Sequence, residues 1–205
     1  LEGMFAIALW DKKYNNLYLI RDRVGEKPLY YGVQGKTFMF ASELKALKCH
    51  PNFIGSIDKH SIMLQMKFGY IPAPSSIYKG IAKLEAGRIL KIKFDANGIS
   101  QKIENIPYWS AENLLRNCLS EPFEGDFSSA ILGLENVLIK AVKAQMISDV
   151  PIGSFLSGGI DSSLIVSIMQ SLSDSPVNTF TIGFQEDKFN EANYAKKVST
   201  LLGTD

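Results

Sequence analysis

The sequence predicts two successive architectures in one chain: an α+β part dominated by antiparallel strands, then an α/β part built on a parallel sheet. Three observations support this prediction. Short apolar runs separated by turn residues fill the first half of the chain, and a long helical pattern of apolar residues begins at Ala130. After that pattern, strand-like runs alternate with helical ones, which is typical of parallel strands joined by crossover helices.

Paired apolar runs at the start of the chain predict two β-hairpins. Residues 4–10 and 16–21 flank the polar segment DKKYNN, which has the composition of a turn. Residues 29–33 and 37–41 flank a second turn that contains a glycine. We therefore expect four antiparallel strands before the first helix.

After these hairpins, the first part is expected to hold two short helices and one more hairpin. Ser42 is the expected N-cap of the first helix, and the second helix should start near Asp58. The expected elements are helices over residues 43–48 and 57–69, a strand over 87–94, a turn over 95–98 and a final strand to about Ile103.

A change of character divides the chain into two expected domains. The first covers residues 1–110, and the second covers 128–205. Between them, residues 111–127 are mixed in composition and read as a linker. The second domain opens with an amphipathic helix of about five turns. The strands and helices expected after it cover, in order, residues 152–156, 162–173, 177–184 and 191–202.

The composition excludes several classes of protein. The formal net charge is +1 without long runs of one sign, so no nucleic-acid or acidic-membrane partner is expected. Cys49 and Cys118 are too few for a disulfide framework, and His50 and His60 are too isolated for a metal cluster. The chain opens in a strand-like run without Met and closes at the end of a helical pattern. We therefore expect a piece of a longer cytoplasmic protein.

The segment FLSGGIDSS, residues 155–163, carries the strongest indication of chemistry. Gly158 and Gly159 follow a predicted strand, and they let the backbone turn sharply and approach a ligand closely. The predicted helix after them presents free N–H groups and a partial positive charge. Such a site at the C-terminal end of a parallel strand suits a nucleotide phosphate. Hydroxyl donors are added by Ser157, Ser162 and Ser163.

Asp161, in the middle of this segment, would repel a phosphate unless a Mg²⁺ ion lies between the two. The alternative is that Asp161 or Ser162 only caps the helix. Spacing alone leaves both interpretations open and favours nucleotide binding.

Several motifs together resemble one family. SGGIDSS resembles the SGGxDS loop of the ATP pyrophosphatase (PP-loop) superfamily, and the wider segment 148–165 is similar to glutamine-hydrolysing asparagine synthetases. GMFAIALWD (3–11), RDRVGEKPLYYG (21–32) and ASELKAL (41–47) resemble the second half of that family's class II glutamine amidotransferase domain. Residues 70–90 fit the segment that follows. The resemblance thus covers most of the chain in the family's order.

The resemblance implies a glutamine-dependent asparagine synthetase that uses ATP and Mg²⁺. In such enzymes ATP adenylates the aspartate side chain and releases pyrophosphate. Ammonia made from glutamine then travels through an internal tunnel and attacks the β-aspartyl-AMP. The implied partners are the small molecules glutamine, aspartate and ATP, without nucleic acid or membrane, and a homodimer is compatible with the resemblance.

The resemblance also assigns roles to individual residues. Asp161 would hold the Mg²⁺ ion, while Leu156 would touch the nucleotide at the strand end. Ile182 would pack near adenine, unless it is ordinary sheet core. Met4 would line the ammonia tunnel, with core packing as an equal alternative. The pyrophosphate would be held by Ser157, Gly158, Gly159, Asp161 and Ser162.

The sequence also departs from the family pattern. The family's glutaminase nucleophile is an N-terminal cysteine, whereas this chain begins with Leu1 and has its cysteines in other motifs. We therefore expect no glutaminase centre here, and a synthetase site that needs residues beyond Asp205. Two alternatives stay open: a related amidotransferase or β-lactam-synthetase-like ligase acting on another carboxylate, and a non-catalytic nucleotide-binding module.

Overall fold

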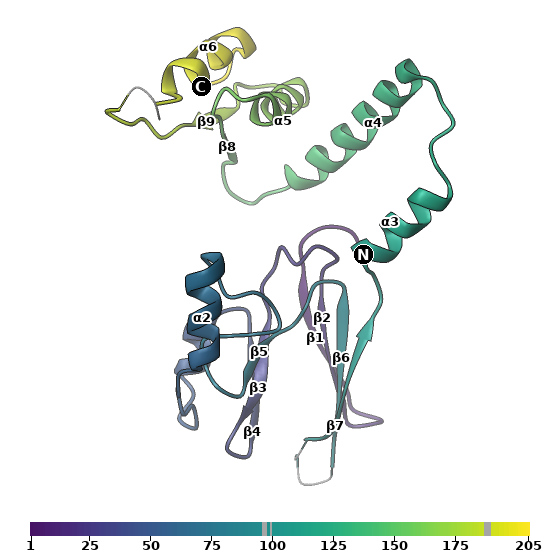
Figure 1. Cartoon of the computed structure of the whole chain (residues 1–205), viewed down its shortest axis with the longest axis vertical. Helices are drawn as coiled ribbons and strands as arrows, with labels where there is room; N and C mark the ends of the chain where they lie inside the picture. Colours follow the sequence, from purple (N-terminus) through teal and green to yellow (C-terminus); the bar gives the residue numbers. More distant parts are fainter. Residues whose placement is uncertain (96–97, 99, 187–189) are drawn as a thin grey trace. The chain divides into compact units, whose positions relative to one another are not determined.

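The computed structural model of this chain describes residues 1–95, 98, 100–186 and 190–205. The chain divides into two compact units, Leu1–Pro122 and Phe123–Asp205, and each is described by itself (Figure 1). The turn predicted over residues 95–98 includes Ala96 and Asn97, which lie outside the described residues.

The first unit contains a four-stranded antiparallel sheet. Leu19 stands opposite Ala8 on one neighbouring strand and Leu90 on the other, so the centre of the sheet is apolar. The last hairpin was predicted to end near Ile103, but its ladder continues to Pro107. The strands, in their hydrogen-bonded order, are β1 (Ala6–Asp11), β2 (Asn16–Arg21), β6 (Arg88–Phe94) and β7 (Ser100–Pro107).

A second antiparallel sheet of the first unit has the order β4 (Thr37–Ala41), β3 (Tyr30–Gln34), β5 (Ile81–Lys83). The two hairpins predicted at the start of the chain are confirmed by the pairing of β1 with β2 and of β3 with β4. Tyr31 and Phe38 pack against the main apolar cluster of the unit. The buried members of that cluster are Leu17, Leu19, Leu29, Leu84, Leu90 and Ile92.

Two helices of the first unit follow β4. Helix α2 (Lys59–Phe68) starts next to Asp58 as predicted, and Asp58 is its N-cap, with its carboxylate accepting from the backbone N–H of Ser61 at 3.0 Å. The prediction for α1 (Leu44–Lys48) was wrong in its cap, because Glu43 and not Ser42 occupies the N-cap position. Glu43 makes no side-chain capping bond, since its carboxylate instead pairs with Lys45 at 2.6 Å.

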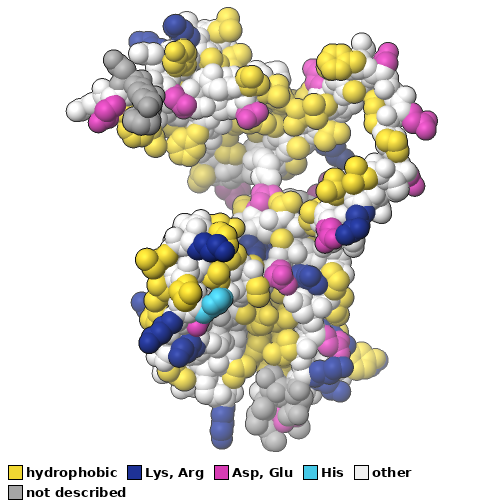
Figure 2. Space-filling model, viewed as in Figure 1, with side chains coloured by type: hydrophobic (Ala, Val, Ile, Leu, Met, Phe, Trp, Pro, Cys, Tyr) yellow, Lys and Arg dark blue, Asp and Glu magenta, His cyan; other side chains and the backbone are white. Residues whose placement is uncertain are grey.

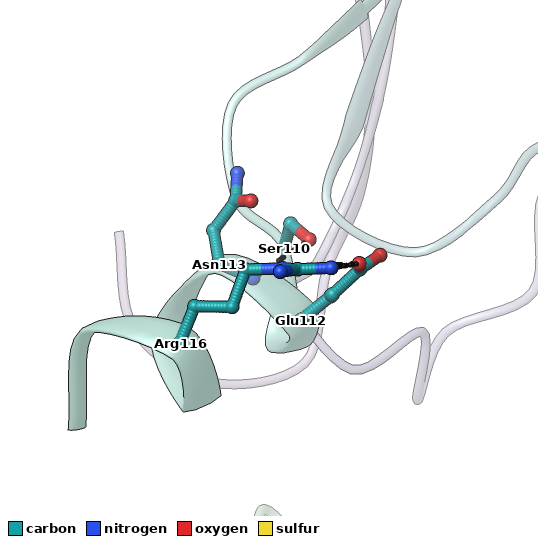
Figure 3. A network of polar contacts seen from close by, with 4 residues as sticks. All are labelled: Ser110, Glu112, Asn113 and Arg116. Atoms are coloured by element: carbon teal, nitrogen blue, oxygen red, sulfur yellow. Dashed lines mark hydrogen bonds and ion pairs between the residues drawn. The ribbon is translucent and has the colours of Figure 1, made fainter. Parts of the chain in front are cut away.

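The segment predicted to be a linker contains a helix, α3 (Ala111–Ser120), and the boundary between the two compact units falls within that segment, after Pro122. The Ser110 hydroxyl accepts from the backbone N–H of Asn113 at 3.4 Å, and Arg116 pairs with Glu112 at 2.7 Å (Figure 3). No residue of α3 is buried. Local contacts along one helix therefore define it, and the mixed composition of the segment concealed them.

Two charged residues at the end of β2 are buried and satisfied by the backbone. Arg21 is 8% exposed and Asp22 only 1%. The carboxylate of Asp22 accepts from the N–H groups of Glu26 and Lys27 at 2.9 Å each. The guanidinium of Arg21 donates to the carbonyls of Gly25, Lys27 and Leu84. Together, Arg21 and Asp22 therefore fix the path of the chain that leaves β2.

The second unit joins helices to one pair of parallel strands. Strand β8 runs beside β9 in the same direction, with Ser154 opposite Thr179, as expected for strands joined by a crossover helix. Buried Val142 and Ile168 bring the first two helices of the unit together over this pair. The elements in order are α4 (Phe127–Gln145), β8 (Gly153–Phe155), α5 (Ile160–Ser171), β9 (Asn178–Phe180) and α6 (Ala192–Leu202).

The strand predicted over residues 177–184 is shorter than expected. Only Asn178–Phe180 belongs to β9, because β8 itself ends at Phe155 and offers no further partner. The opposite edge of β9 contacts the last residue, as the N–H of Asp205 donates to the Val177 carbonyl at 3.0 Å. Residues 181–184 after Phe180 belong to no strand.

Many apolar side chains of the second unit lie on its surface. Figure 2 shows hydrophobic side chains gathered over its helices. Within α4 only Val142 is buried, while Phe127 and Ile131 on its earlier turns are exposed. Among the described helices, none combines the length and the apolar character that crossing a bilayer requires.

Candidate functional site

The segment FLSGGIDSS forms a tight connection between β8 and α5, as the sequence predicted. Gly158 has φ of +79°, a left-handed conformation that side chains rarely adopt. Gly159 is the N-cap of α5, and the helix begins at Ile160, two residues before the predicted start at Ser162. The loop therefore ends where the free N–H groups of a twelve-residue helix begin.

The loop is held from outside by α6. A Cβ built on Gly158 would lie 2.7 Å from the Cβ of Tyr194 and 2.9 Å from the backbone nitrogen of Ala195. No side chain fits at that distance, so the glycine is required both by its φ and by this close approach. Helix α6 is consequently part of the framework that shapes the loop.

Two serine hydroxyls lie together inside the turn. The Oγ atoms of Ser157 and Ser162 are 2.9 Å apart, and the Ser162 hydroxyl also lies 3.2 Å from the Gly159 carbonyl, to which it can donate. The Ser157 hydroxyl accepts from the N–H of Gly159 at 3.3 Å. The two hydroxyls thus pre-arrange the turn while remaining half-buried at its surface.

The capping alternative for Asp161 and Ser162 does not hold. Gly159 occupies the N-cap position, and no side-chain cap bond is made there. Asp161 lies in the first turn of α5 with an exposed side chain, and no hydrogen bond or ion pair of its carboxylate is found among the described residues. Its carboxylate is therefore available to a ligand at the loop.

A cavity of about 260 Å³ lies beside the loop. Leu156 and Ile182 both line it, which brings together the two residues predicted to contact a nucleoside. Leu156 itself is 2% exposed and packs in a core cluster with Val166 and Ala195. Ile182 is 66% exposed, so the alternative that it is sheet core is wrong. The remaining lining residues are Phe155, Ser157, Phe180, Thr181, Phe184 and Glu191.

The other predicted residues belong to the first unit. Met4 is 58% exposed and precedes β1, so it is not packed in the core of that unit. Cys49 and Cys118 are free and exposed thiols, in agreement with the sequence-based expectation. Within the described parts of the chain, no three His, Cys, Asp or Glu side chains gather as a metal site would require.

Sequence reasoning missed the contributions of Glu191 and Tyr194. Both come from the start of α6, and their proximity to the loop follows from how α6 folds back onto α5. No local pattern around either residue indicates this contact. The glycine at position 158 was the only signal in the sequence for this contact. A position without a side chain suggests that another segment lies close to it, but the sequence does not say which segment.

Comparisons with known proteins agree with the motifs. A family model described as a glutamine amidotransferase domain matches residues 1–109, and one described as asparagine synthase matches residues 133–205. A Methanocaldococcus jannaschii protein, provisionally named glutamine-hydrolysing asparagine synthetase 2, is 39% identical over 98% of this chain. The chain belongs to the glutamine amidotransferase domain family, and its second part matches the asparagine synthase family model. The resemblance inferred from the motifs is thereby confirmed.

Other relatives match the chain over a similar extent. Asparagine synthetase (glutamine-hydrolysing) 1 of Bacillus subtilis is 36% identical over 99% of the chain. A protein named amidase chry2, from Gibberella zeae, is 27% identical over 100% of the chain. The chain spans 38% of the length of the M. jannaschii protein and 30% of that of the B. subtilis protein.

Proposed function

We propose that this chain contributes part of a glutamine-dependent asparagine synthetase, including the loop that holds the pyrophosphate of ATP. One observation carries the proposal. A glycine turn at the C-terminal end of a parallel strand leads into a helix N-terminus, inside the region that matches the asparagine synthase family model. In this proposal the first unit belongs to the amidotransferase domain that delivers ammonia in the full-length enzyme, and the second unit begins the synthetase domain.

The proposed reaction has two steps. A carboxylate oxygen of aspartate attacks the α-phosphorus of ATP, which breaks the bond to the β-phosphate and releases pyrophosphate. Ammonia then attacks the activated carbonyl of β-aspartyl-AMP, so that a C–N bond forms, AMP leaves and one proton is released. Activation is needed because a carboxylate is a poor electrophile, whereas AMP is a good leaving group.

The loop geometry suits the departing pyrophosphate. Free N–H groups at the start of α5 and the partial positive charge of the helix favour an anion there. The hydroxyls of Ser157 and Ser162 are already oriented by each other and can donate to phosphate oxygens. Gly159 adds no side chain at the start of the helix, where a Cβ would meet only the Ser157 hydroxyl at 3.3 Å, so the backbone there is open to a ligand.

The exposed carboxylate of Asp161 fits a Mg²⁺ ion shared with phosphate. Mg²⁺ in such sites is bound by one or two carboxylates together with substrate phosphates and water, so a larger acidic cluster is not required. When bound, the ion neutralises charge that develops on the departing pyrophosphate. Asp161 would hold the ion at the loop, and the free N–H groups at the start of α5 would hold the remaining phosphate charge.

The cavity beside the loop is proposed to take the nucleoside. Its walls are largely apolar, with Leu156 at the strand end and Ile182 on the opposite segment. Met4 is proposed to line the ammonia tunnel, since it is an exposed apolar side chain ahead of β1. The proposed substrates are small molecules only. The proposed enzyme is cytoplasmic, and a homodimer is compatible with the proposal.

Asp161→Asn tests the proposal in a full-length family protein that carries this sequence. The variant should lose ATP–pyrophosphate exchange, because the amide cannot neutralise the ion, while glutamine hydrolysis is retained. Asp174→Asn, on the exposed turn before β9, is the matched control and should leave exchange intact. Unchanged exchange in Asp161→Asn would show that this loop does not serve adenylation.

The 205-residue chain provides a second test. Neither of its exposed cysteines stands in a nucleophile motif, so glutaminase activity should be undetectable in the isolated polypeptide. Robust release of ammonia from glutamine by this polypeptide would contradict the assignment of its first unit.

A second candidate function is ATP-dependent ligation of another carboxylate, as in β-lactam-synthetase-like relatives. The match to amidase chry2 along the whole chain favours keeping this candidate, since that protein does not carry the synthetase name. Substrate-dependent AMP release by the full-length protein separates the two. Aspartate should stimulate release under the first proposal, and a different carboxylate should do so under the second.

A further inference from the structure

Among the residues that the structure describes, eight line the cavity beside the loop, and one of the eight is charged. Five lining residues are apolar, namely Phe155, Leu156, Phe180, Ile182 and Phe184. Ser157 and Thr181 add hydroxyls, and Glu191 adds the single carboxylate. Apolar and aromatic walls with few polar groups are typical of sites that accept a flat base, and the polar groups then fix its orientation.

The carboxylate of Glu191 is not used by its own helix. Glu191 stands at the N-cap position of α6, yet it makes no side-chain capping bond. The N–H of Ala192 is instead satisfied by the Asn190 side chain, whose Oδ1 accepts at 3.2 Å. The Glu191 side chain is exposed and lines the cavity, so its oxygens can accept hydrogen bonds from a ligand.

The position of Glu191 is tied to the phosphate loop through α6. The backbone carbonyl of Glu191 accepts from the N–H groups of Tyr194 and Ala195 at 3.0 Å each. The same two residues are the ones that approach Gly158. One helical turn thus connects the loop to the carboxylate, which places an acceptor at a fixed distance from the phosphate site.

We propose that Glu191 selects adenine over 6-oxopurines by accepting a hydrogen bond from the exocyclic amino group of the base. This inference rests on the proposed function, because it requires a nucleotide at the loop. Adenine presents an amino donor at position 6, whereas inosine and guanosine present a carbonyl oxygen there. That oxygen would face the carboxylate without a donor between them, and the unpaired acceptors would disfavour binding.

Nucleotide binding to a full-length family protein that carries this sequence tests the inference without relying on catalysis. The probes are ATP, inosine triphosphate and 2′-deoxy-ATP at millimolar concentrations, with Kd values from ligand-observed NMR titrations. Wild type should prefer ATP over inosine triphosphate about tenfold, as expected for one hydrogen bond to an exposed carboxylate. Glu191→Gln should reduce this preference to about twofold, because an amide can also donate to the 6-oxo group.

Glu186→Gln is the matched control, since it removes a carboxylate from the same connection without altering the lining of the cavity. It should keep the preference of wild type. An unchanged preference in Glu191→Gln would overturn the inference and leave nucleotide binding at the loop in place.

Two further outcomes would also overturn it. A change confined to the ratio of ATP to 2′-deoxy-ATP would mean that the carboxylate contacts the ribose. Failure of the wild-type protein to bind any of the three nucleotides would remove the base-selection role together with the nucleotide site itself. The ATP titration therefore reports on the proposed function, and the ratio of affinities reports on Glu191.

Discussion

Gly158 and Tyr194 approach so closely that a Cβ on the glycine would lie 2.7 Å from the Cβ of the tyrosine. The backbone of the glycine loop therefore lies directly against the Cβ of Tyr194 in α6. This relationship makes the loop's shape depend on a helix that begins more than thirty residues later in the chain.

Gly158→Ala should destabilise the second unit by about 2 kcal/mol or more, because the new methyl group meets α6 and the φ of +79° is unfavourable for alanine. Urea unfolding of the whole chain, together with hydrogen exchange of α6 amides, measures the effect. Gly159→Ala is the matched control, as its φ is −73° and its Cβ would meet only the Ser157 hydroxyl at 3.3 Å. Equal losses in both variants would contradict the packing argument.

Ser162→Ala should weaken ATP binding about fivefold, the effect of one hydrogen bond of roughly 1 kcal/mol, with little change in overall stability. The hydroxyl of Ser162 also orients that of Ser157, so part of the loss arises through its neighbour. Titration with ATP measures this. Ser167→Ala, on the same helix, removes a hydroxyl that donates to the Leu164 carbonyl at 2.8 Å and should leave affinity unchanged.

Asp22→Asn should destabilise the first unit by about 2–3 kcal/mol at pH 7, since a buried carboxylate acceptor of several N–H groups is replaced by an amide. Burial raises the pKa of Asp22, but N–H donors from Lys27, Glu26, Gly25 and Phe5 together bring that pKa below its ordinary value. Urea unfolding at several pH values measures the difference between wild type and variant.

The sign of the pH dependence follows from this lowered pKa. The carboxylate of Asp22 stabilises the fold fully above its unfolded pKa of about 3.9, and the stabilisation is lost as pH falls through the folded pKa. The difference between wild type and Asp22→Asn should therefore shrink on acidification below about pH 4. A difference that stayed constant from pH 7 to pH 2 would argue against an ionised Asp22.

Helix α3 should be the least protected helix of the first unit in hydrogen exchange. It has no buried residue, and a ten-residue helix without packing is marginal in water. Ser110→Ala removes its cap and should accelerate exchange of its first-turn amides, whereas Ser120→Ala at the other end should affect only the last turn. Strong protection of α3 amides in the isolated chain would contradict this prediction.

Sequence patterns predicted the elements that depend on local chemistry. The hairpins followed from apolar runs around turns, and the start of α2 was placed near Asp58, which is its N-cap. The glycine turn between β8 and α5 was predicted for the same reason, because glycines, serines and an apolar strand stand next to one another in the sequence.

Patterns failed where a neighbour distant in sequence decides the outcome. Strand β9 stops at Phe180 because β8 ends at Phe155 and has no further residues to pair with it, although the apolar run in the sequence continues. Glu191 and Tyr194 lie near the loop because α6 packs against it, and no periodic pattern in the sequence predicts this packing. Helix α3 was missed because its mixed composition concealed a serine cap and an i,i+4 ion pair.

The short parallel pair of β8 and β9 has a consequence for how the chain behaves in concentrated solution. Two three-residue strands leave the outer edge of β8 open, next to the exposed ring of Phe155. An open edge with an aromatic side chain is a template for pairing with another molecule. Self-association of this polypeptide should therefore begin at β8, and a lysine introduced at Ser154 should improve its solubility.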